Sequence, residues 1–303
     1  MSSFSKRGLN LRAMGFCGAD DSVSPEHLQL LSIHYPWIEW GVLFRPDLEG
    51  TPRYATMAWV EQLCKINQDT GGSMRLAAHL CGSRCEEVVL QGDTTFLRTL
   101  STLGFGRVQI NATKANNVNV VQGDANNSMS YAQNLMNCVT NVPELEFIFQ
   151  LNTETTHIWN EFIKIAENGK TEAGDIGEAS AGIPSNLSVL YDASCGLGKL
   201  STSYAAPLVI NGQKIPSGYA GGIAPDNVKS VLENVMTASN GEAVWIDMES
   251  SLRTKVLLED KSNPENNQIQ DVFSMETCFK CVMIGTAHFP QTLPVSRYTI
   301  MSI

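Results

Sequence analysis

Several features that would assign this chain to a special class are missing from its sequence. No apolar run approaches the roughly 18 residues of a membrane-spanning helix, so no membrane partner is expected. Residues Met1 to Arg12 contain no apolar signal region before a cleavage site, which predicts a cytoplasmic location. Basic residues are outnumbered, 21 Lys and Arg against 31 Asp and Glu, and a net charge of -10 argues against nucleic acid as a partner.

The 303 residues that are present have a globular composition, with 43% hydrophobic and 17% charged residues, enough for one sizeable core. Eight cysteines in a cytoplasmic chain are interpreted as free thiols. Cys81/Cys85 and Cys278/Cys281 have a spacing that zinc sites also use. The two pairs would not be adjacent in the fold predicted below, so no metal or other cofactor is expected.

Short apolar runs alternate along the chain with helical patterns. Eight strands alternating with helices imply a parallel sheet with crossover connections, and closure into a single-domain α/β fold, a (β/α)8 TIM barrel, fits the count. A doubly wound open sheet is the alternative. No linker or internal repeat divides the chain. The predicted strands are Leu11–Phe16, Trp37–Phe44, Met74–His79, Arg107–Asn111, Leu145–Leu151, Leu187–Asp192, Tyr219-Ala220 and Ala243–Met248.

The predicted helices follow these strands, and the first has Ser24 as its N-cap. Two long strand-end loops, about residues 112–126 and 250–270, are predicted on the functional face as candidate lids, because barrels carry their sites at the C-terminal ends of the strands. The predicted helices are Pro25–His34, Ala55–Asn67, Glu86–Leu100, Asn127–Cys138, Glu154–Glu167, Pro225–Met236 and Asp271–Ile284.

Strand-end segments carry a resemblance to one family. Phe16-Cys17-Gly18 resembles the Lys-Ile-Cys-Gly motif of phosphoribosylanthranilate isomerase, the barrel of the tryptophan pathway. Gly41–Phe44, followed by Thr51–Tyr54, is similar to that family's Gly-Phe-Val-Phe and Ser-Pro-Arg-Tyr.

Three later segments extend the same resemblance. Leu190–Asp192, followed by Gly196–Lys199, resembles Leu-Leu-Asp and Gly-Thr-Gly-Lys. Ala220–Val228 resembles Ala-Gly-Gly-Leu-X-Pro-Glu-Asn-Val, and Trp245–Ser250 resembles Val-Asp-Val-Ser-Ser-Gly. Each motif is short, but their order and rough spacing cover nearly the whole barrel.

The resemblance implies a cofactor-free, Amadori-type aldose–ketose rearrangement. Cys17 would be the general base, Asp192 the general acid, and Arg53 would hold the substrate carboxylate. Gly221 and Gly222 would bind the substrate phosphate, and glycines before a helix do form anion sites. The loop with Gly196 and Gly198 could add donors, and the substrate-binding set is completed by Glu249, Ser250 and Arg253.

The sequence departs from the family at three positions. Gly15 stands where the family has Lys, Asn111-Ala112 replaces His-Gly, and Glu249-Ser250-Ser251 replaces the Ser-Ser-Gly phosphate turn. A carboxylate at Glu249 opposes a phosphate dianion. It could instead bind a sugar hydroxyl, an amine or a metal, or be neutralised by Arg253.

Each site residue also has a structural interpretation. Cys17 could be a small buried hydrophobe, Asp192 the cap of the next turn, Arg53 a solvated arginine, and Gly221-Gly222 a turn that needs glycine. His79, at the end of the third strand, is interpreted as a polar residue near the core, with an acid, base or ligand role as the alternative. Trp37, Trp40 and Phe44 are predicted core residues.

Three functional hypotheses follow. The first is an isomerase acting on a small, phosphorylated, N-linked or amino sugar, with phosphoribosylanthranilate as the default substrate. The second is a barrel enzyme of another class, such as a lyase, epimerase or hydrolase. The third is a non-catalytic ligand-binding barrel. A homo-oligomer is left open by the sequence.

Overall fold

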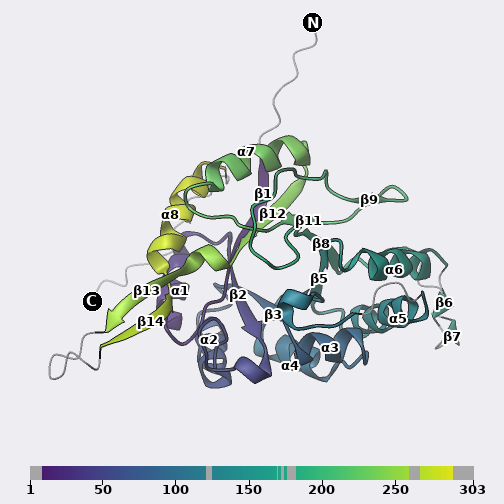
Figure 1. Ribbon diagram of the computed structural model, residues 1–303, viewed down its shortest axis with the longest axis horizontal. Helices are drawn as coiled ribbons and strands as arrows, with labels where there is room; N and C mark the ends of the chain where they lie inside the picture. The colour runs from purple at the N-terminus through teal and green to yellow at the C-terminus, as the bar shows by residue number, and fades with distance from the viewer. Residues whose placement is uncertain are drawn as a thin grey trace, which may run out of the picture.

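A computed structural model describes residues 9–120, 125–168, 170–171, 174–175, 182–258 and 267–288. Eight parallel strands close into a barrel in the order β1-β12-β11-β8-β5-β4-β3-β2, which confirms the predicted TIM barrel and rules out the open sheet (Figure 1). The barrel strands are β1 (Asn10–Cys17), β2 (Ile38–Phe44), β3 (Arg75–Leu80), β4 (Arg107–Ile110), β5 (Glu146–Leu151), β8 (Leu187–Tyr191), β11 (Ser217–Tyr219) and β12 (Ala243–Met248).

The helices cover the outside of the barrel (Figure 1). Helix α1 begins at Pro25 after Ser24, as predicted, although the Ser24 side chain makes no capping hydrogen bond to the backbone. Thr56 caps α2 by accepting from Trp59 N. The helices are α1 (Pro25–His34), α2 (Met57–Asp69), α3 (Ser83–Val89), α4 (Thr95–Leu103), α5 (Ala125–Asn141), α6 (Thr156–Asn168), α7 (Val228–Ser239) and α8 (Met275–Gly285). None in the described part of the chain is long and apolar enough to cross a membrane.

Most of the apolar core lies between the barrel and the helices, and it includes Trp40 and Phe44, as predicted. A smaller cluster inside the barrel is built on Trp245. A Cβ on Gly218 would overlap its indole ring, which explains why β11 carries a glycine. At the N-terminal end, the buried Arg107 pairs with Glu39 and stacks 4.2 Å from the Trp245 ring. A cavity of about 620 Å³ opens at this end, lined by Arg12, Glu39, Arg107 and Glu146 among others. The strand-end residues selected from the sequence lie at the opposite, C-terminal end of the strands.

Two sequence predictions are wrong in their secondary structure. The helix predicted over Glu86–Leu100 is split into α3 and α4, because Gly92 has a φ of 66° and Asp93 accepts a hydrogen bond from Thr95 N. The loop predicted over residues 250–270 is an antiparallel hairpin of β13 (Arg253–Leu258) and β14 (Gln268–Phe273), and residues 259–266 lie outside the described part.

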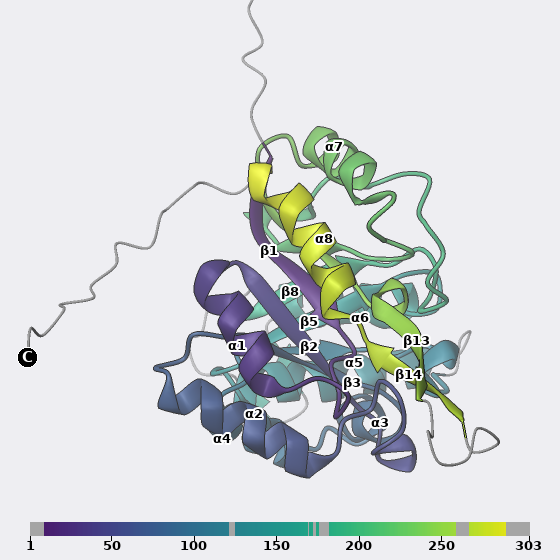
Figure 2. The same cartoon turned by 90° about the vertical axis from the view of Figure 1, so that its left-hand side faces the viewer.

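The hairpin projects from the barrel beside α8 (Figure 2). Because β14 includes Asp271–Phe273, the last helix begins later than predicted, at Met275, with Ser274 accepting from Thr277 N. The other long loop contains a 3-10 turn, Lys114–Asn116, before residues 121–124, which are not described. Two-residue strands also pair as β6 (Lys170–Thr171) with β7 (Gly174–Asp175), and as β9 (Val209–Ile210) with β10 (Gln213–Lys214).

Candidate functional site

A cavity of about 400 Å³ lies at the C-terminal ends of the barrel strands. Eight of the ten residues selected from the sequence line it: Arg53, Asp192, Gly196, Gly198, Gly221, Gly222, Glu249 and Ser250. Cys17 and Arg253 are not among its lining residues. The strand-end rule therefore locates the cavity correctly, and two of the predicted side chains lie outside it.

Cys17 is fully buried in a cluster with Leu43 and Cys81. Burial raises the pKa of the Cys17 thiol well above its usual value, and the nearby carboxylates of Glu249 and Asp247 raise it further. A general base needs a thiolate, whose pKa must be lowered. The surroundings of Cys17 thus oppose the role that the resemblance implies.

His79 lies next to Cys17, and its Nδ1 is 3.1 Å from Cys17 Sγ. Burial, together with the positive charge of Arg107, lowers the pKa of His79 to about 3, so the ring stays neutral. A Cβ on Gly41 would lie 2.9 Å from both Cys17 Sγ and His79 Nε2. The glycine makes room for this neutral pair, which matches the structural interpretation of His79.

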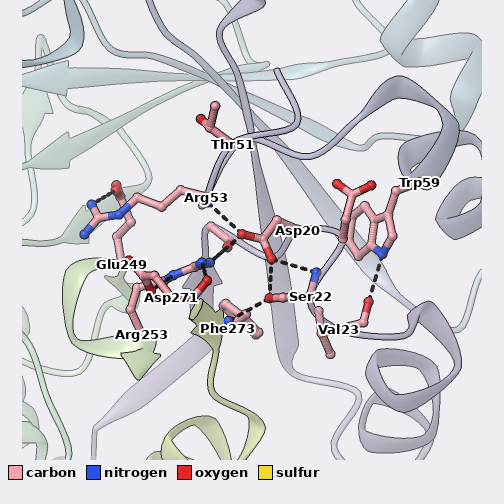
Figure 3. A network of polar contacts seen from close by, with 12 residues as sticks. Asp20, Ser22, Val23, Thr51, Arg53, Trp59, Glu249, Arg253, Asp271 and Phe273 are labelled. Atoms are coloured by element: carbon pink, nitrogen blue, oxygen red, sulfur yellow. Dashed lines mark hydrogen bonds and ion pairs between the residues drawn. The ribbon is translucent and has the colours of Figure 1, made fainter. Parts of the chain in front are cut away.

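Arg253 is held in a buried network around Asp20 (Figure 3). Its Nη1 donates to Asp20 Oδ2 at 2.7 Å and to Gly18 O at 3.0 Å, and its Nε donates to Asp271 Oδ1 at 2.9 Å. Ser22 Oγ accepts from Phe273 N in the same network. Arg253 thus fastens the hairpin to the loop after β1. It forms no ion pair with Glu249, although its charge lowers the pKa of that carboxyl.

Arg53 connects this network to the cavity (Figure 3). Its backbone nitrogen donates to Asp20 Oδ2 at 2.6 Å, and its φ is 83°, in the left-handed region that non-glycine residues rarely adopt. Its Nη1 donates to Glu249 Oε1 at 3.0 Å, with both side chains about a third exposed. Asp20, which sequence analysis did not select, therefore fixes the backbone from which Arg53 reaches the cavity.

Asp192 accepts four hydrogen bonds. Oδ1 accepts from the nitrogen and the hydroxyl of Ser194 at 3.0 and 2.6 Å. Oδ2 accepts from Gly196 N at 2.8 Å and from Gln150 Nε2 at 2.7 Å. The carboxylate thus caps the turn after β8 while it lines the cavity. Acting as a proton donor would require the loss of one of these bonds.

Asp247 lies two residues before Glu249 on β12, directly opposite Gly15 of β1. Burial raises the pKa of Asp247 well above its usual value, and the carboxylates of Glu39 and Glu249 raise it further. Its side chain makes no hydrogen bond to any part of the chain that the structure describes. A Cβ on Gly15 would overlap Oδ1 of Asp247, so the carboxyl occupies the space where the resembled family has a lysine.

Glu249 differs from Asp247 in its surroundings. Burial raises the pKa of Glu249, the ion pair with Arg53 opposes that rise, and the charge of Asp192 adds to it. The side chain is 35% exposed, so it still reaches solvent. The two carboxyl groups, both partly buried, thus differ in their partners: Asp247 has no hydrogen bond within the described residues, and Glu249 is paired with a cation.

Gly221 and Gly222 have φ values of 104° and 62° and need to be glycines. The loop from Gly196 to Leu200 packs onto them. A Cβ on Gly222 would overlap Leu200 N and lie 2.7 Å from the carbonyl carbon of Lys199, and one on Gly221 would lie 2.9 Å from Lys199 O. Close approach of two loops therefore accounts for both glycines.

Sequence analysis missed part of the lining. Neither Asp247 nor the polar side chains on neighbouring strands were selected as site residues. These come from the ends of β4 and β5 and the loop after β4: Gln109, Asn111, Asn116 and Gln150. Their alternate positions on the strands were a usable signal, since inward-facing polar residues at strand ends surround a barrel mouth.

No group of three or more His, Cys, Asp or Glu side chains that could hold a metal ion is found within the described ranges. All eight cysteines are free thiols, and seven of them are buried. Cys278 and Cys281 lie in α8, and Cys85 lies in α3.

Comparisons with known proteins add little. No family model matches the chain, and no curated protein matches it. Among solved structures, morphinone reductase is similar over 82% of this chain and 87% of that chain, at 11% identity and a TM-score of 0.42. This similarity is too weak to carry an argument about function. The fold assignment rests on the closed order of the strands.

Proposed function

We propose that this chain is a cofactor-free barrel enzyme that isomerises a small polyhydroxylated molecule by moving protons between neighbouring atoms. The reaction class is the aldose–ketose rearrangement implied by the resemblance to phosphoribosylanthranilate isomerase. The observation that carries the proposal is the contrast between Asp247 and Glu249, because environments that separate two carboxyl groups identify an acid and a base.

Asp247 has the properties of the acid. It is partly buried, its pKa is raised, and no described residue donates to it. A carboxyl group that stays protonated near neutral pH can donate its proton to a substrate oxygen.

Glu249 has the properties of the base. Arg53 favours its ionised form, while burial keeps its pKa above the usual value, which makes it a stronger proton acceptor than an ordinary carboxylate. Glu249 directly follows β12, two residues after Asp247, and the two positions are roughly 7 Å apart along the extended chain. That separation suits a substrate held across both of them.

The proton balance closes without an added reagent. Asp247 protonates the ring oxygen, and the hydroxyl at C1 loses its proton as the ring opens to the aldehyde. The Asp247 carboxylate takes up the proton of the C1 hydroxyl and so becomes an acid again. Glu249 then takes the proton from C2, the C–H electrons form the C1–C2 double bond, and Asp247 protonates O1. Finally Asp247 takes the O2 proton as the C2 carbonyl forms, and Glu249 returns its proton to C1, which gives the ketose and restores both groups. Asp192, with its four hydrogen bonds, would hold a substrate hydroxyl.

This assignment replaces the pair that the resemblance implies. A base at Cys17 would require a buried thiol to lose its proton beside two carboxylates, against the direction of its pKa shift. The raised pKa of Cys17 also favours a second candidate function, which is a barrel enzyme of another reaction class or a barrel that only binds its ligand.

The test is proton exchange in heavy water. An isomerase of this kind replaces the C2 hydrogen of its substrate with deuterium, and NMR detects the loss of that signal. A panel of aldoses, together with phosphoribosylanthranilate, should reveal exchange with the wild-type chain. Asp247→Asn and Glu249→Gln should each reduce the rate by about 10²–10⁴-fold.

Cys17→Ala is the control variant, since it alters a buried group beside the cavity. It should retain most of the deuterium exchange at C2. Loss of exchange in Cys17→Ala, with full exchange in both carboxylate variants, would restore the family's mechanism. Ligand binding without exchange of any substrate would favour the non-catalytic barrel.

A further inference from the structure

Charged groups around the cavity are mostly of one sign. Asp192 and Glu249 line it as carboxylates, Asp247 lines it as the proposed proton donor, and Arg53 is the one cationic side chain among its described lining residues. Arg53 already pairs with Glu249. Arg253 is 6% exposed and pairs with Asp20. A phosphate dianion would therefore approach carboxylates with no uncommitted cation in the described lining, and like charges at short range repel strongly where water is excluded.

The glycine pair lines the cavity, but the loop before it fills the space on the side where a Cβ would lie. The atom nearest to a Cβ at Gly221 would be the carbonyl oxygen of Lys199, at 2.9 Å. A carbonyl oxygen carries partial negative charge, so it repels an anion.

Gln150 supplies an observation that concerns the ligand directly. It is 3% exposed and lines the cavity from β5. Its Nε2 donates to Asp192, which fixes the orientation of the amide because a carboxylate can only accept there. The opposite atom, Oε1, is buried and has no hydrogen-bond partner among the described residues. A buried acceptor of this kind is costly unless a donor reaches it.

We infer that the cavity takes a neutral, unphosphorylated polyhydroxylated molecule such as a free sugar, with hydroxyl groups donating to Gln150 Oε1, Asp192 and Glu249. The inference rests on the proposed function and deepens it, because it replaces the phosphorylated substrate that the sequence predicts. The cavity volume of about 400 Å³ lies in the range of small-molecule sites.

Binding of matched pairs by calorimetry tests it, with D-ribose against D-ribose 5-phosphate, D-glucose against D-glucose 6-phosphate, and inorganic phosphate alone. We expect the free sugar of at least one pair to bind at least about tenfold more tightly than its phosphate ester, and inorganic phosphate not to compete. Equal binding within every pair, binding of neither member of any pair, or tighter binding of a phosphate ester would overturn the inference.

Glu249→Ser sharpens the test, because it restores the serine of the resembled family and releases Arg53. The phosphate ester should then gain about tenfold in affinity relative to its free sugar. Glu249→Gln keeps the shape of the side chain and should also shift the relative affinity toward the phosphate ester. This variant replaces Glu249→Ser in the test if the serine variant fails to fold. Glu61→Ser removes one charge from the exposed surface of α2 and should leave the preference unchanged.

The two proposals fail in different ways. Preferential binding of a free sugar without deuterium exchange keeps the ligand class and rejects the isomerase. Exchange on a phosphate ester keeps the isomerase and rejects the ligand class.

Discussion

Gly15 and Asp247 face each other across the β1–β12 pair, and the carboxyl of Asp247 fills the space that a side chain at Gly15 would need. The resembled family has a lysine at the position of Gly15. The glycine at position 15 and the position of the Asp247 carboxyl therefore depend on each other, since neither a lysine nor an alanine fits beside Asp247 in this conformation.

Gly15→Ala should displace the Asp247 carboxyl and lower the free energy of unfolding by about 1–3 kcal/mol. In an Asp247→Ala background, Gly15→Ala should lower the free energy of unfolding by about 0.5–3 kcal/mol less, because the new Cβ no longer overlaps a carboxyl group. Urea denaturation of the four chains measures this coupling. Gly106→Ala is the control, since nothing lies within 4 Å of a Cβ there. Equal costs in both backgrounds would contradict the relationship.

Asp247 should make stability depend on pH in a defined direction. Its folded pKa lies above the unfolded one, so the folded chain holds more protons between these two values, and stability falls as pH rises through that window. Each unit of difference corresponds to about 1.4 kcal/mol. In Asp247→Asn, the free energy of unfolding should decrease less steeply with rising pH above about pH 4. Unfolding measured across pH checks it, and Asp226→Asn, on an exposed residue, should keep the wild-type slope.

Thiol labelling distinguishes a buried Cys17 from a reactive base. Cys195 is partly exposed and the other seven cysteines are buried. Ellman's reagent at neutral pH should therefore modify one thiol rapidly in the folded chain, and Cys195→Ser should abolish that phase. Mass spectrometry should find Cys17 labelled only after denaturation. Rapid modification of Cys17 in the folded chain would show that its thiolate is accessible.

Gly222→Ala should be far more damaging than Gly212→Ala. Both glycines have positive φ values, 62° and 81°, so both variants carry similar backbone strain of about 1 kcal/mol. Only at Gly222 would the new Cβ also overlap the backbone of Leu200, whereas nothing lies within 4 Å at Gly212. Thermal unfolding of the two variants isolates the loop contact. Matching losses would mean that the Gly196–Leu200 loop does not pack as described.

Much of the fold could be predicted from local patterns. The buried strand over Ala243–Met248 and the helix Pro25–His34 agree with the structure to the residue, because continuous apolar runs and a Ser-Pro start are local signals. The break after α3 was missed, although Gly92 followed by Asp93 and a threonine pair is a recognisable stop and cap. The hairpin β13–β14 was missed because its strands alternate weakly and are largely exposed.

The site was predictable to the extent that it depends on position along a strand. Asp192 and Glu249 follow from the strand-end rule. The role of Asp20 could not be predicted, because it depends on Arg53 and Arg253, which come from distant parts of the chain. The unpaired oxygen of Gln150 likewise depends on the contact of its amide with Asp192, across two strands.

The barrel closes by pairing β1 with β12, strands more than 200 residues apart in the sequence. The two carboxyl groups assigned to acid and base, Asp247 and Glu249, belong to that final strand and the turn after it. During synthesis, therefore, the first seven barrel strands emerge before either group exists, and the closing contacts are among the most non-local in the chain. Under the proposed assignment, a partly made chain would be inactive, because the last segment to join the barrel carries both proposed reactive groups.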